Sequence, residues 1–402
     1  MRRAVITGMG AVTAAGADVP SLVASLRDAR CSLGPISLFE TGDLGPRVAG
    51  EVAEIPATHL RPRGIARASR SDRLALVAAE EALTQASLLP DGADPRRLAV
   101  SIGSSTGGML EVEHYHDARR SSRPNAHLRP GLLAATVGAP TDLVAAACGA
   151  EGRRLSPSTA CSSGAMAIAF GLLWIRSGAA DVVIAGGTDA LCRMTVSGFH
   201  SLKAMSPEPC RPFDRERSGL SLGEGAGVVV LESEDHARGR GARILAEVCG
   251  SGISCDASHP TAPHEASRGA IAALEGALRD ANWDPREVNY INAHGTGTPQ
   301  NDPAEARAIR TVLGTDAERS RVSSTKGAIG HLLGAAGSVE AILTIACLRD
   351  GFLPPQVGFR TADPECALPF VKDAEETKAA AALSNSYGFG GNNVSLALRV
   401  EN

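Results

Sequence analysis

One cysteine of this chain lies where a reactive thiol would be expected. Cys161 stands among small residues in the segment 156–166 and directly precedes an apolar run over residues 165–175, which is longer than a typical strand. We expect this run to form a buried helix. Its free backbone N–H groups and the positive end of its dipole would point at the sulfur and favour the reactive thiolate. A buried structural thiol is the alternative for any single cysteine.

Two histidines in the later part of the chain lie at the ends of predicted strands. His294 follows the strand-like segment 288–293, and His331 follows the strand-like segment 321–325 and precedes a helix of small residues. Either histidine alone is more often structural than catalytic. Together with Cys161 they supply a nucleophile and two Nε donors at strand ends, where α/β sheets bind ligands. The glycines beside them would allow a substrate to approach the backbone closely.

The composition describes a tightly packed α/β protein. Of the 402 residues, 44% are hydrophobic but only 3% are aromatic, and 44 are glycine. The core must therefore be built from Ala, Val, Leu and Ile with many close backbone approaches. The formal net charge of −4 gives no overall basic field for nucleic acid. No apolar run approaches the roughly 20 residues that a membrane helix requires, so we expect no membrane partner.

The cysteine pattern bears on metal binding and on location. The nine cysteines are scattered, and none forms a Cys-x-x-Cys pair. We therefore expect neither a zinc ribbon nor a dithiol redox motif, and no metal. An odd number of cysteines without a signal peptide favours a reducing, cytoplasmic location.

The chain divides into two halves with the same order of elements. Both alternate a strand, a glycine-rich corner and a small-residue helix, and the charged segment 232–243 is the best boundary. We expect an N-terminal half over residues 1–240 with the candidate nucleophile and a C-terminal half over residues 241–402 with both histidines. The opening segment 4–13 is similar to a dinucleotide-binding fingerprint, but Thr13 stands where the third glycine is required. We interpret it as the first core strand.

Two polar segments carry further expectations. Residues 60–73 hold five arginines and one acidic residue and lead into a helix predicted over residues 74–83. Such a run is usually a solvated face, and the functional alternative is a docking patch for an acidic partner. Residues 111–130 are polar, contain arginine and proline, and are predicted to form a loop or lid.

Four longer motifs resemble those of one enzyme family and occur in the family's order. The motifs are Ser158-Thr-Ala-Cys161-Ser-Ser-Gly164, Asn292-Ala-His-Gly-Thr-Gly-Thr298, Ser324-Thr-Lys-Gly-Ala-Ile-Gly-His-Leu-Leu-Gly-Ala-Ala-Gly337 and Asn385-Ser-Tyr-Gly-Phe-Gly-Gly391. Over nearly its whole length the chain resembles the elongating β-ketoacyl-[acyl carrier protein] synthases of type II systems, which have the thiolase-like fold. The resemblance implies an α/β fold of two pseudo-duplicated halves, each with a mixed five-stranded sheet, in α-β-α-β-α layers.

The resemblance implies an acyltransferase that performs a decarboxylative Claisen condensation. Cys161 would take an acyl group from an acyl carrier protein as a thioester. Malonyl-[acyl carrier protein] would then lose carbon dioxide and attack this acyl group to give 3-oxoacyl-[acyl carrier protein]. His294 and His331 would donate hydrogen bonds to the enolate oxygen that forms on decarboxylation. The backbone N–H groups of Cys161 and Phe389 would form the oxyanion hole.

The resemblance also assigns residues around the reacting groups. Lys326 would support the region of His331 electrostatically, with Glu340 as its buried counter-charge. Phe389, which is flanked by glycines, would be the gate that separates acyl loading from malonyl entry. The other implied residues are Thr296, Thr298 and Thr261 on the phosphopantetheine arm, Thr106 and Phe199 in the acyl pocket, Asp302 and Asn385 in structural roles, and Arg63, Arg67, Arg70 and Lys203 on the carrier-protein docking surface.

The pair of histidines sets the implied subtype. Biosynthetic thiolases use a second cysteine in this place, and initiating synthases pair their cysteine with one histidine and one asparagine. His294 with His331 is therefore the pattern of decarboxylative elongation. Cys161 argues against a chain-length factor, the inactive partner subunit of aromatic polyketide systems, because such subunits lack the nucleophile.

The resemblance implies an acyl carrier protein and a second subunit as partners. No cofactor would bind tightly, because the substrates arrive on the 4′-phosphopantetheine arm of the carrier. Family members are dimers, and the apolar segment 182–185 is a candidate interface strand. The sequence leaves open a homodimer or a heterodimer with a chain-length-factor-like subunit, in which alone the chain would be active. It also leaves open fatty acid elongation or a type II polyketide or polyene pathway.

Overall fold

The fold is built on one continuous ten-stranded sheet. The structure, a computed structural model, describes residues 1–42, 48–88, 93–121 and 124–401. The strands follow each other in the order β11-β10-β14-β15-β9-β1-β8-β6-β4-β5. Their bounds are β1 (Ala4–Thr13), β4 (Leu98–Gly103), β5 (Arg154–Leu155), β6 (Val182–Asp189), β8 (Gly225–Ser233), β9 (Ala246–Cys255), β10 (Tyr290–Asn292), β11 (Arg321–Ser323), β14 (Ala381–Gly388) and β15 (Asn392–Val400).

The two halves of this sheet have the same topology. In β5-β4-β6-β8-β1, the first three strands are parallel to one another and the last two pairings are antiparallel. The second five strands, β11-β10-β14-β15-β9, repeat this sequence of pairings. The halves join where β9 pairs with β1, at Val5 with Glu247 and Ile6 with Ala246. The expected pair of mixed five-stranded sheets is therefore confirmed.

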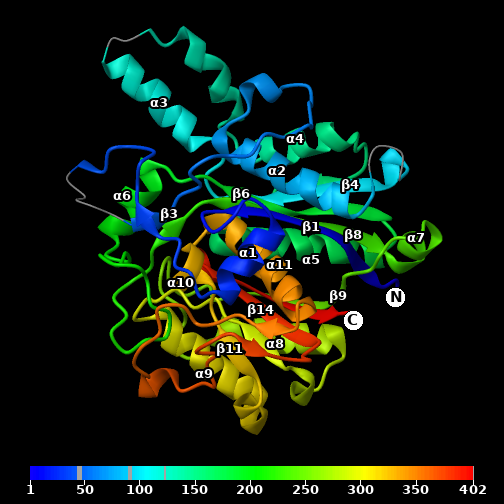
Figure 1. Ribbon diagram of the computed structural model, residues 1–402, viewed down its shortest axis with the longest axis vertical. Coiled ribbons are helices and arrows are strands. Elements are labelled where there is room, and N and C mark those ends of the chain that lie inside the picture. Colours follow the sequence, from blue (N-terminus) through cyan, green and yellow to red (C-terminus); the bar gives the residue numbers. More distant parts are fainter. Residues whose placement is uncertain (43–47, 89–92, 122–123, 402) are drawn as a thin grey trace.

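Helices complete the five layers. Helices α2 (Arg70–Gln85) and α4 (Ala139–Cys148) cover the first half of the sheet, and α8 (Arg268–Ala281) and α9 (Asn301–Leu313) cover the second (Figure 1). Helices α5 (Ser163–Arg176) and α11 (Ala336–Arg349) lie between the two halves and contact strands of both. This central layer carries the candidate nucleophile at the start of α5.

Small residues allow the two central helices to pack closely. A Cβ atom added at Gly164 of α5 would lie 3.0 Å from the backbone nitrogen of Ser338 on α11. One added at Gly337 of α11 would lie 2.9 Å from the backbone nitrogen of Ala165 on α5. Any larger residue at either position would push the helices apart.

Helix α2 begins earlier than the sequence predicts. Its first residue is Arg70, because Ser69 and Asp72 form a capping box in which each side chain accepts the other's backbone N–H. The arginine-rich segment therefore ends inside a helix and does not continue as an irregular chain to residue 73. This changes the surroundings of Arg70, which are described below.

The prediction of a loop or lid over residues 111–130 is wrong. Helix α3 (Met109–Arg120) occupies its first part, and the 3₁₀ helix η4 (Ala126–Ala134) follows as an arm on the outside of the molecule (Figure 1). Of the twelve residues of α3, all described, only Leu110 is buried. An apolar stripe is therefore missing, and the helix depends on bonds from its carboxylates to neighbouring elements. Sequence periodicity cannot detect such bonds.

The segment 182–185 is not an interface strand, so this prediction is also wrong. It lies in β6, which pairs with β4 on one side and with β8 on the other. Its side chains are fully buried within the chain. Its apolar character reflects a strand covered on both faces, as parallel sheets require.

The remaining elements complete the described chain. They are α1 (Val19–Arg27), α6 (Arg193–Ser201), α7 (Glu234–Gly239), α10 (Lys326–Ile329), a three-stranded sheet of β2 (Gly34–Pro35), β3 (Val48–Gly50) and β7 (Leu222–Gly223), and a two-stranded sheet of β12 (Phe352–Leu353) and β13 (Glu375–Glu376). No single helix in this described part has the length and apolar composition to cross a membrane. Only η4 and α4 reach that composition together, and they meet at 83°.

Candidate active site

Cys161 lies in a tight turn immediately before α5. The turn is the 3₁₀ helix η5 (Ala160–Ser162), and Ala160 has a φ of 53°, which directs the chain sharply into the helix. A Cβ atom at Gly388 would lie 2.7 Å from the carbonyl oxygen of Thr159, so the glycine-rich loop after β14 lies against this turn. The expected buried helix after the cysteine is therefore present, and Cys161 is 6% exposed.

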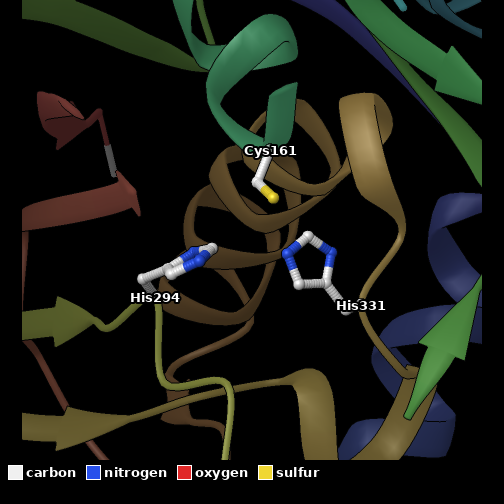
Figure 2. Close-up of side chains that lie close together, drawn as sticks. All are labelled: Cys161, His294 and His331. Atoms are coloured by element: carbon white, nitrogen blue, oxygen red, sulfur yellow. The ribbon is translucent and has the colours of Figure 1, made fainter. Parts of the chain in front are cut away.

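The structure brings Cys161, His294 and His331 together. One ligand atom of each lies within 4.8 Å of the others. The two imidazole rings are 5.4 Å apart between centroids and nearly perpendicular, at 87°. Figure 2 shows the sulfur of Cys161 directed toward the space between these rings. Three side chains from distant parts of the sequence thus surround one small volume.

Hydrogen bonds outside this volume set the tautomer of both imidazoles. The Nδ1 atom of His331 accepts the backbone N–H of Leu333 at 3.0 Å. The Nδ1 atom of His294 lies 3.3 Å from Nζ of Lys326, which can only donate. Both rings therefore carry their proton on Nε2. Burial and the charge of Lys326 lower the pKa of both histidines well below 6.5, so both rings are neutral donors.

Lys326 and Glu340 form a fully buried ion pair behind His294. Nζ of Lys326 donates to Oε1 of Glu340 and, at 2.6 Å, to the backbone carbonyl of His294. The predicted electrostatic effect of Lys326 on His331 is present, but of the two histidines Lys326 makes its closest contacts with His294. Its hydrogen bonds go to His294, and it acts on His331 only through its charge. The turn of α10, which begins with Lys326, points the ammonium toward β10, where His294 follows.

Burial opposes ionisation of the candidate nucleophile. It raises the pKa of Cys161 to about 11, although Lys326 and the backbone N–H groups of Phe389 and Cys161 itself lower it. The backbone N–H groups therefore favour the thiolate as expected, but burial outweighs their effect in the protein without substrate. At neutral pH the sulfur is a thiol, and the dry surroundings that stop its ionisation also strengthen every hydrogen bond in the site.

A cavity of about 240 Å³ opens onto these groups. Threonine hydroxyls and aromatic rings share its walls, and the hydroxyls of Thr296 and Thr298 lie 2.8 Å apart. The residues predicted from the sequence that line it are Cys161, His294, His331, Thr296, Thr298, Thr261, Phe199, Lys203 and Phe389. A partly polar cavity of this kind can hold part of an elongated substrate.

Phe389 closes one side of the cavity next to the sulfur. Its ring stacks on Phe199 of α6, with centroids 5.4 Å apart and an angle of 27°. Its backbone N–H faces the sulfur of Cys161 and lowers the pKa of the thiol. Gly390 and Gly391 follow with φ of 79° and 77°, values that favour glycine. The loop and the turn η5 therefore present one N–H group each, those of Phe389 and Cys161, to the sulfur.

Comparison with known proteins identifies the family. The N-terminal domain of β-ketoacyl synthases matches residues 1–237, and the C-terminal domain of β-ketoacyl synthases matches residues 245–360. The chain belongs to the β-ketoacyl synthase family. Among members of this family, 3-oxoacyl-[acyl-carrier-protein] synthase 2 of Synechocystis sp. is 37% identical over 412 residues, which cover 99% of this chain and 98% of that protein.

Solved structures of ketosynthases agree with this assignment. The ishigamide ketosynthase/chain length factor matches with a TM-score of 0.93 at 34% identity, over 100% of both chains. A type II polyketide ketosynthase, AntDE, solved with its acyl-carrier protein AntF and bound to the hexaketide, matches with a TM-score of 0.89 at 28% identity, also over 100% of both chains. The thiolase-like fold expected from the sequence is thus shared with β-ketoacyl synthases.

Two residues with predicted structural roles make buried hydrogen bonds around the active site. Asp302, fully buried, accepts the backbone N–H groups of Phe213 at 2.7 Å and of Thr296 at 3.0 Å. Asn385 donates to Glu305 at 3.2 Å. Asp302 thus shapes the turn that carries the two threonines.

Sequence reasoning missed two buried carboxylates. Glu305 accepts the backbone N–H groups of His294 and Gly295, each at 2.8 Å, and its burial raises its pKa to about 7. Asp189 accepts N–H groups from Ser105 at 2.9 Å and Gly334 at 2.6 Å. The only sequence signal for Glu305 was its spacing of three residues from Asp302 on one helix face.

Two predicted residues, Thr106 and Arg70, lie outside the cavity and the exposed surface. Thr106 is not among the cavity-lining residues, and its hydroxyl donates to Asp189 at 3.0 Å, so its place in an acyl pocket stays a prediction. The prediction that Arg70 is a docking residue is wrong. Its guanidinium pairs with buried Glu224 at 2.6 and 2.9 Å, and is turned inward. Arg63 and Arg67 are exposed.

The three central side chains are also the group in the described chain that could share a metal ion. Metal ligation would require a lone pair on the inward nitrogen of each imidazole. The bonds from Leu333 and Lys326 place those lone pairs on the outward Nδ1 atoms instead. The arrangement therefore suits hydrogen-bond donation to an oxygen atom better than metal binding.

Proposed function

We propose that this chain condenses an acyl group held on Cys161 with malonyl-[acyl carrier protein] to give 3-oxoacyl-[acyl carrier protein]. The observation that carries the proposal is the meeting of one thiol with two imidazoles that both present an Nε2–H, beside a cavity of about 240 Å³. A nucleophile with two neutral donors matches the needs of thioester exchange and of enolate stabilisation.

In the first step the sulfur of Cys161 attacks the thioester carbonyl of an acyl carrier. The C–S bond to the carrier breaks, a C–S bond to Cys161 forms, and the thiol proton ends on the released carrier thiol. The backbone N–H groups of Cys161 and Phe389 hold the oxyanion of the tetrahedral intermediate. The dipole of α5 favours the negative charge that develops on the sulfur.

In the second step the malonyl group loses carbon dioxide. The electron pair of the breaking C–C bond passes into the thioester. The enolate oxygen that forms accepts hydrogen bonds from the Nε2–H groups of His294 and His331. Because both rings are neutral and dry, these bonds stabilise the enolate strongly without transferring a proton. Lys326 keeps His294 in the required tautomer.

In the third step the enolate carbon attacks the acyl group on Cys161. A C–C bond forms, the oxyanion returns to the same two N–H groups, and the Cys161 thiolate leaves and takes up one proton from solvent. Phe389 is proposed as the gate that admits the malonyl arm only after acyl loading, because its ring rests on Phe199 beside the sulfur.

Acyl carrier protein is the proposed carrier of both substrates. The 4′-phosphopantetheine arm would lie along Thr296, Thr298 and Thr261, whose side chains line the cavity. Exposed Arg63, Arg67 and Lys203 remain the proposed docking residues for an acidic carrier, without Arg70. The nine unpaired cysteines suit a reducing, cytoplasmic location.

A ketosynthase active only with a second, chain-length-factor-like subunit is the other candidate. The specific observation in its favour is the TM-score of 0.93 to the ishigamide ketosynthase/chain length factor. In this case the chemistry at Cys161 is unchanged, and the partner determines whether the site is complete.

The deciding experiment incubates the purified chain with an acyl-carrier and malonyl-carrier and measures the product by mass spectrometry. A 3-oxoacyl-carrier two carbons longer supports the proposal, and product that appears only when a partner subunit is added supports the heterodimer. No acyl mass on Cys161 and no carbon dioxide release under either condition would refute both. Replacing Cys161 by alanine provides the matched blank.

A further inference from the structure

Helix α6 forms one wall of the active-site cavity and supports the proposed gate. Its C-terminal part supplies Phe199, and the turn after it supplies Leu202, Lys203 and Ala204, all of which line the cavity. Phe199 is the residue on which the ring of Phe389 stacks. The position of α6 therefore determines where the Phe389 ring, and with it the Phe389 N–H, can rest.

The start of α6 is not capped by its own sequence. The N-cap residue is Cys192, whose side chain makes no capping hydrogen bond. Two N–H groups at this helix start are instead bonded by one carboxylate of α3. Glu113 accepts from Arg193 at 2.9 Å through Oε2 and from Met194 at 2.7 Å through Oε1. Both oxygens of Glu113 are thus used at one helix end.

We infer that Glu113 is a positioning residue for acyl transfer, because it fixes α6 and through Phe199 keeps the N–H of Phe389 on the sulfur of Cys161. The inference rests on the proposed function. Acyl transfer depends on that N–H group, whereas decarboxylation depends on His294 and His331, which are held by β10 and the turns around α10. Loosening α6 should therefore slow the first reaction selectively.

A second contact between the same helices provides a matched control. One turn further along α3, Asp117 pairs with the guanidinium of Arg193 at 3.0 Å. Both side chains of this pair are well exposed, at 45% and 39%. An exposed ion pair adds little to helix position, so Asp117→Asn should leave both reactions nearly unchanged.

The experiment measures two rates in the same preparation of the full chain, with any partner subunit that it requires. One is acylation of Cys161 from acyl-carrier, followed by intact mass. The other is carbon dioxide release from malonyl-carrier by the unacylated protein. For Glu113→Ala we expect the ratio of acylation to decarboxylation to fall by roughly threefold to tenfold, as for loss of a helix cap. Glu113→Gln, which keeps one acceptor oxygen, should give an intermediate ratio.

A double-mutant cycle tests whether the effect passes through Phe199. Phe199→Leu should lower the ratio on its own, and adding Glu113→Ala should then change it by less than about twofold. Equal loss of both rates in Glu113→Ala would show that Glu113 is only structural and would overturn the inference. A full additional effect in the Phe199→Leu background would overturn it as well. If the parent chain performs neither reaction, the proposed function itself fails.

Discussion

The starts of the two central helices are built alike but do different chemistry. Helix α5 follows the 3₁₀ turn η5, and α11 follows the 3₁₀ turn η8 (Leu333–Ala335). Each turn contains a left-handed residue with a φ of 53°, Ala160 in one and Leu333 in the other. Each helix has fourteen residues and ends on an arginine. The same local scaffold presents a sulfur in one half and an imidazole in the other.

The difference lies in what stands behind each helix start. The neighbours of Cys161 along the chain are small and uncharged, and the backbone N–H groups of Cys161 and Phe389 face its sulfur together with the two imidazoles. Behind the imidazoles lies the buried pair of Lys326 and Glu340. Burial keeps both kinds of group neutral, because it raises the pKa of the thiol and lowers that of the rings. One physical cause thus prepares a neutral nucleophile and neutral donors.

The strongest test removes the reactive group from the first helix start. Cys161→Ala should reduce condensation by roughly a thousandfold or more, because no acyl-enzyme can form. Decarboxylation of malonyl-carrier should persist, since the second helix start is intact. Product formation and carbon dioxide release are measured together. Loss of both activities to the same extent would mean that the two helix starts do not work separately.

Removing the charge behind the second helix start should have the next largest effect. Lys326→Met leaves Glu340 buried without its partner and should cost about 3–5 kcal/mol of unfolding free energy. It also frees the tautomer of His294, so decarboxylation should fall by about a hundredfold.

The double variant Lys326→Met with Glu340→Leu separates these two effects. It should recover much of the stability in denaturant titration, because no unpaired charge remains. Decarboxylation should stay low, because Nδ1 of His294 still lacks its donor. Recovery of decarboxylation together with stability would contradict a role for Lys326 in setting the tautomer.

The reactivity of Cys161 should change with pH above neutrality, whereas the protonation of the two histidines should matter only below it. Because the pKa of Cys161 is about 11, its alkylation by iodoacetamide should increase roughly tenfold per unit between about pH 7 and 9. Decarboxylation should stay flat through about pH 6.5, since both histidines remain neutral there. Below about pH 6.5 the two histidines bind protons in the unfolded chain but stay neutral in the folded protein. The free energy of unfolding should therefore decrease as the pH falls. A plateau of alkylation near neutral pH would contradict the raised pKa.

A change outside both helix starts should have the smallest effect. Arg67 is exposed, and Arg67→Glu should raise the KM for acyl-carrier by about threefold to tenfold while kcat stays constant. Acyl transfer from a short phosphopantetheine thioester, which lacks the carrier surface, is the control and should not change. Equal effects on both substrates would remove Arg67 from the docking surface.

The sequence was most informative where chemistry depends on local pattern. Cys161 before a small-residue helix, and histidines after strands, could be recognised because a helix start and a strand end are local features. The repeated order of strand, glycine-rich corner and helix was visible for the same reason, whereas the two mixed five-stranded sheets were implied by the family resemblance. None of these needed knowledge of distant contacts.

Features that depend on long-range bonds escaped prediction. Helix α3 is polar and is held by contacts such as that of Glu113 to α6, so its periodicity resembled a loop. Arg70 looked like its exposed neighbours until Glu224, 154 residues away, was found to pair with it. The raised pKa of Cys161 follows from its burial, which a helix start alone does not reveal.

The two halves of the sheet touch along β9 and β1 at only two described residue pairs, so this seam does little to fix how they are placed. The sulfur belongs to one half and both imidazoles belong to the other. What sets the spacing between them is the contact of α5 with α11 at Gly164 and Gly337. A single methyl group at either glycine would act as a wedge between nucleophile and donors. The distance between the sulfur and the two imidazoles therefore depends on the absence of side chains at Gly164 and Gly337.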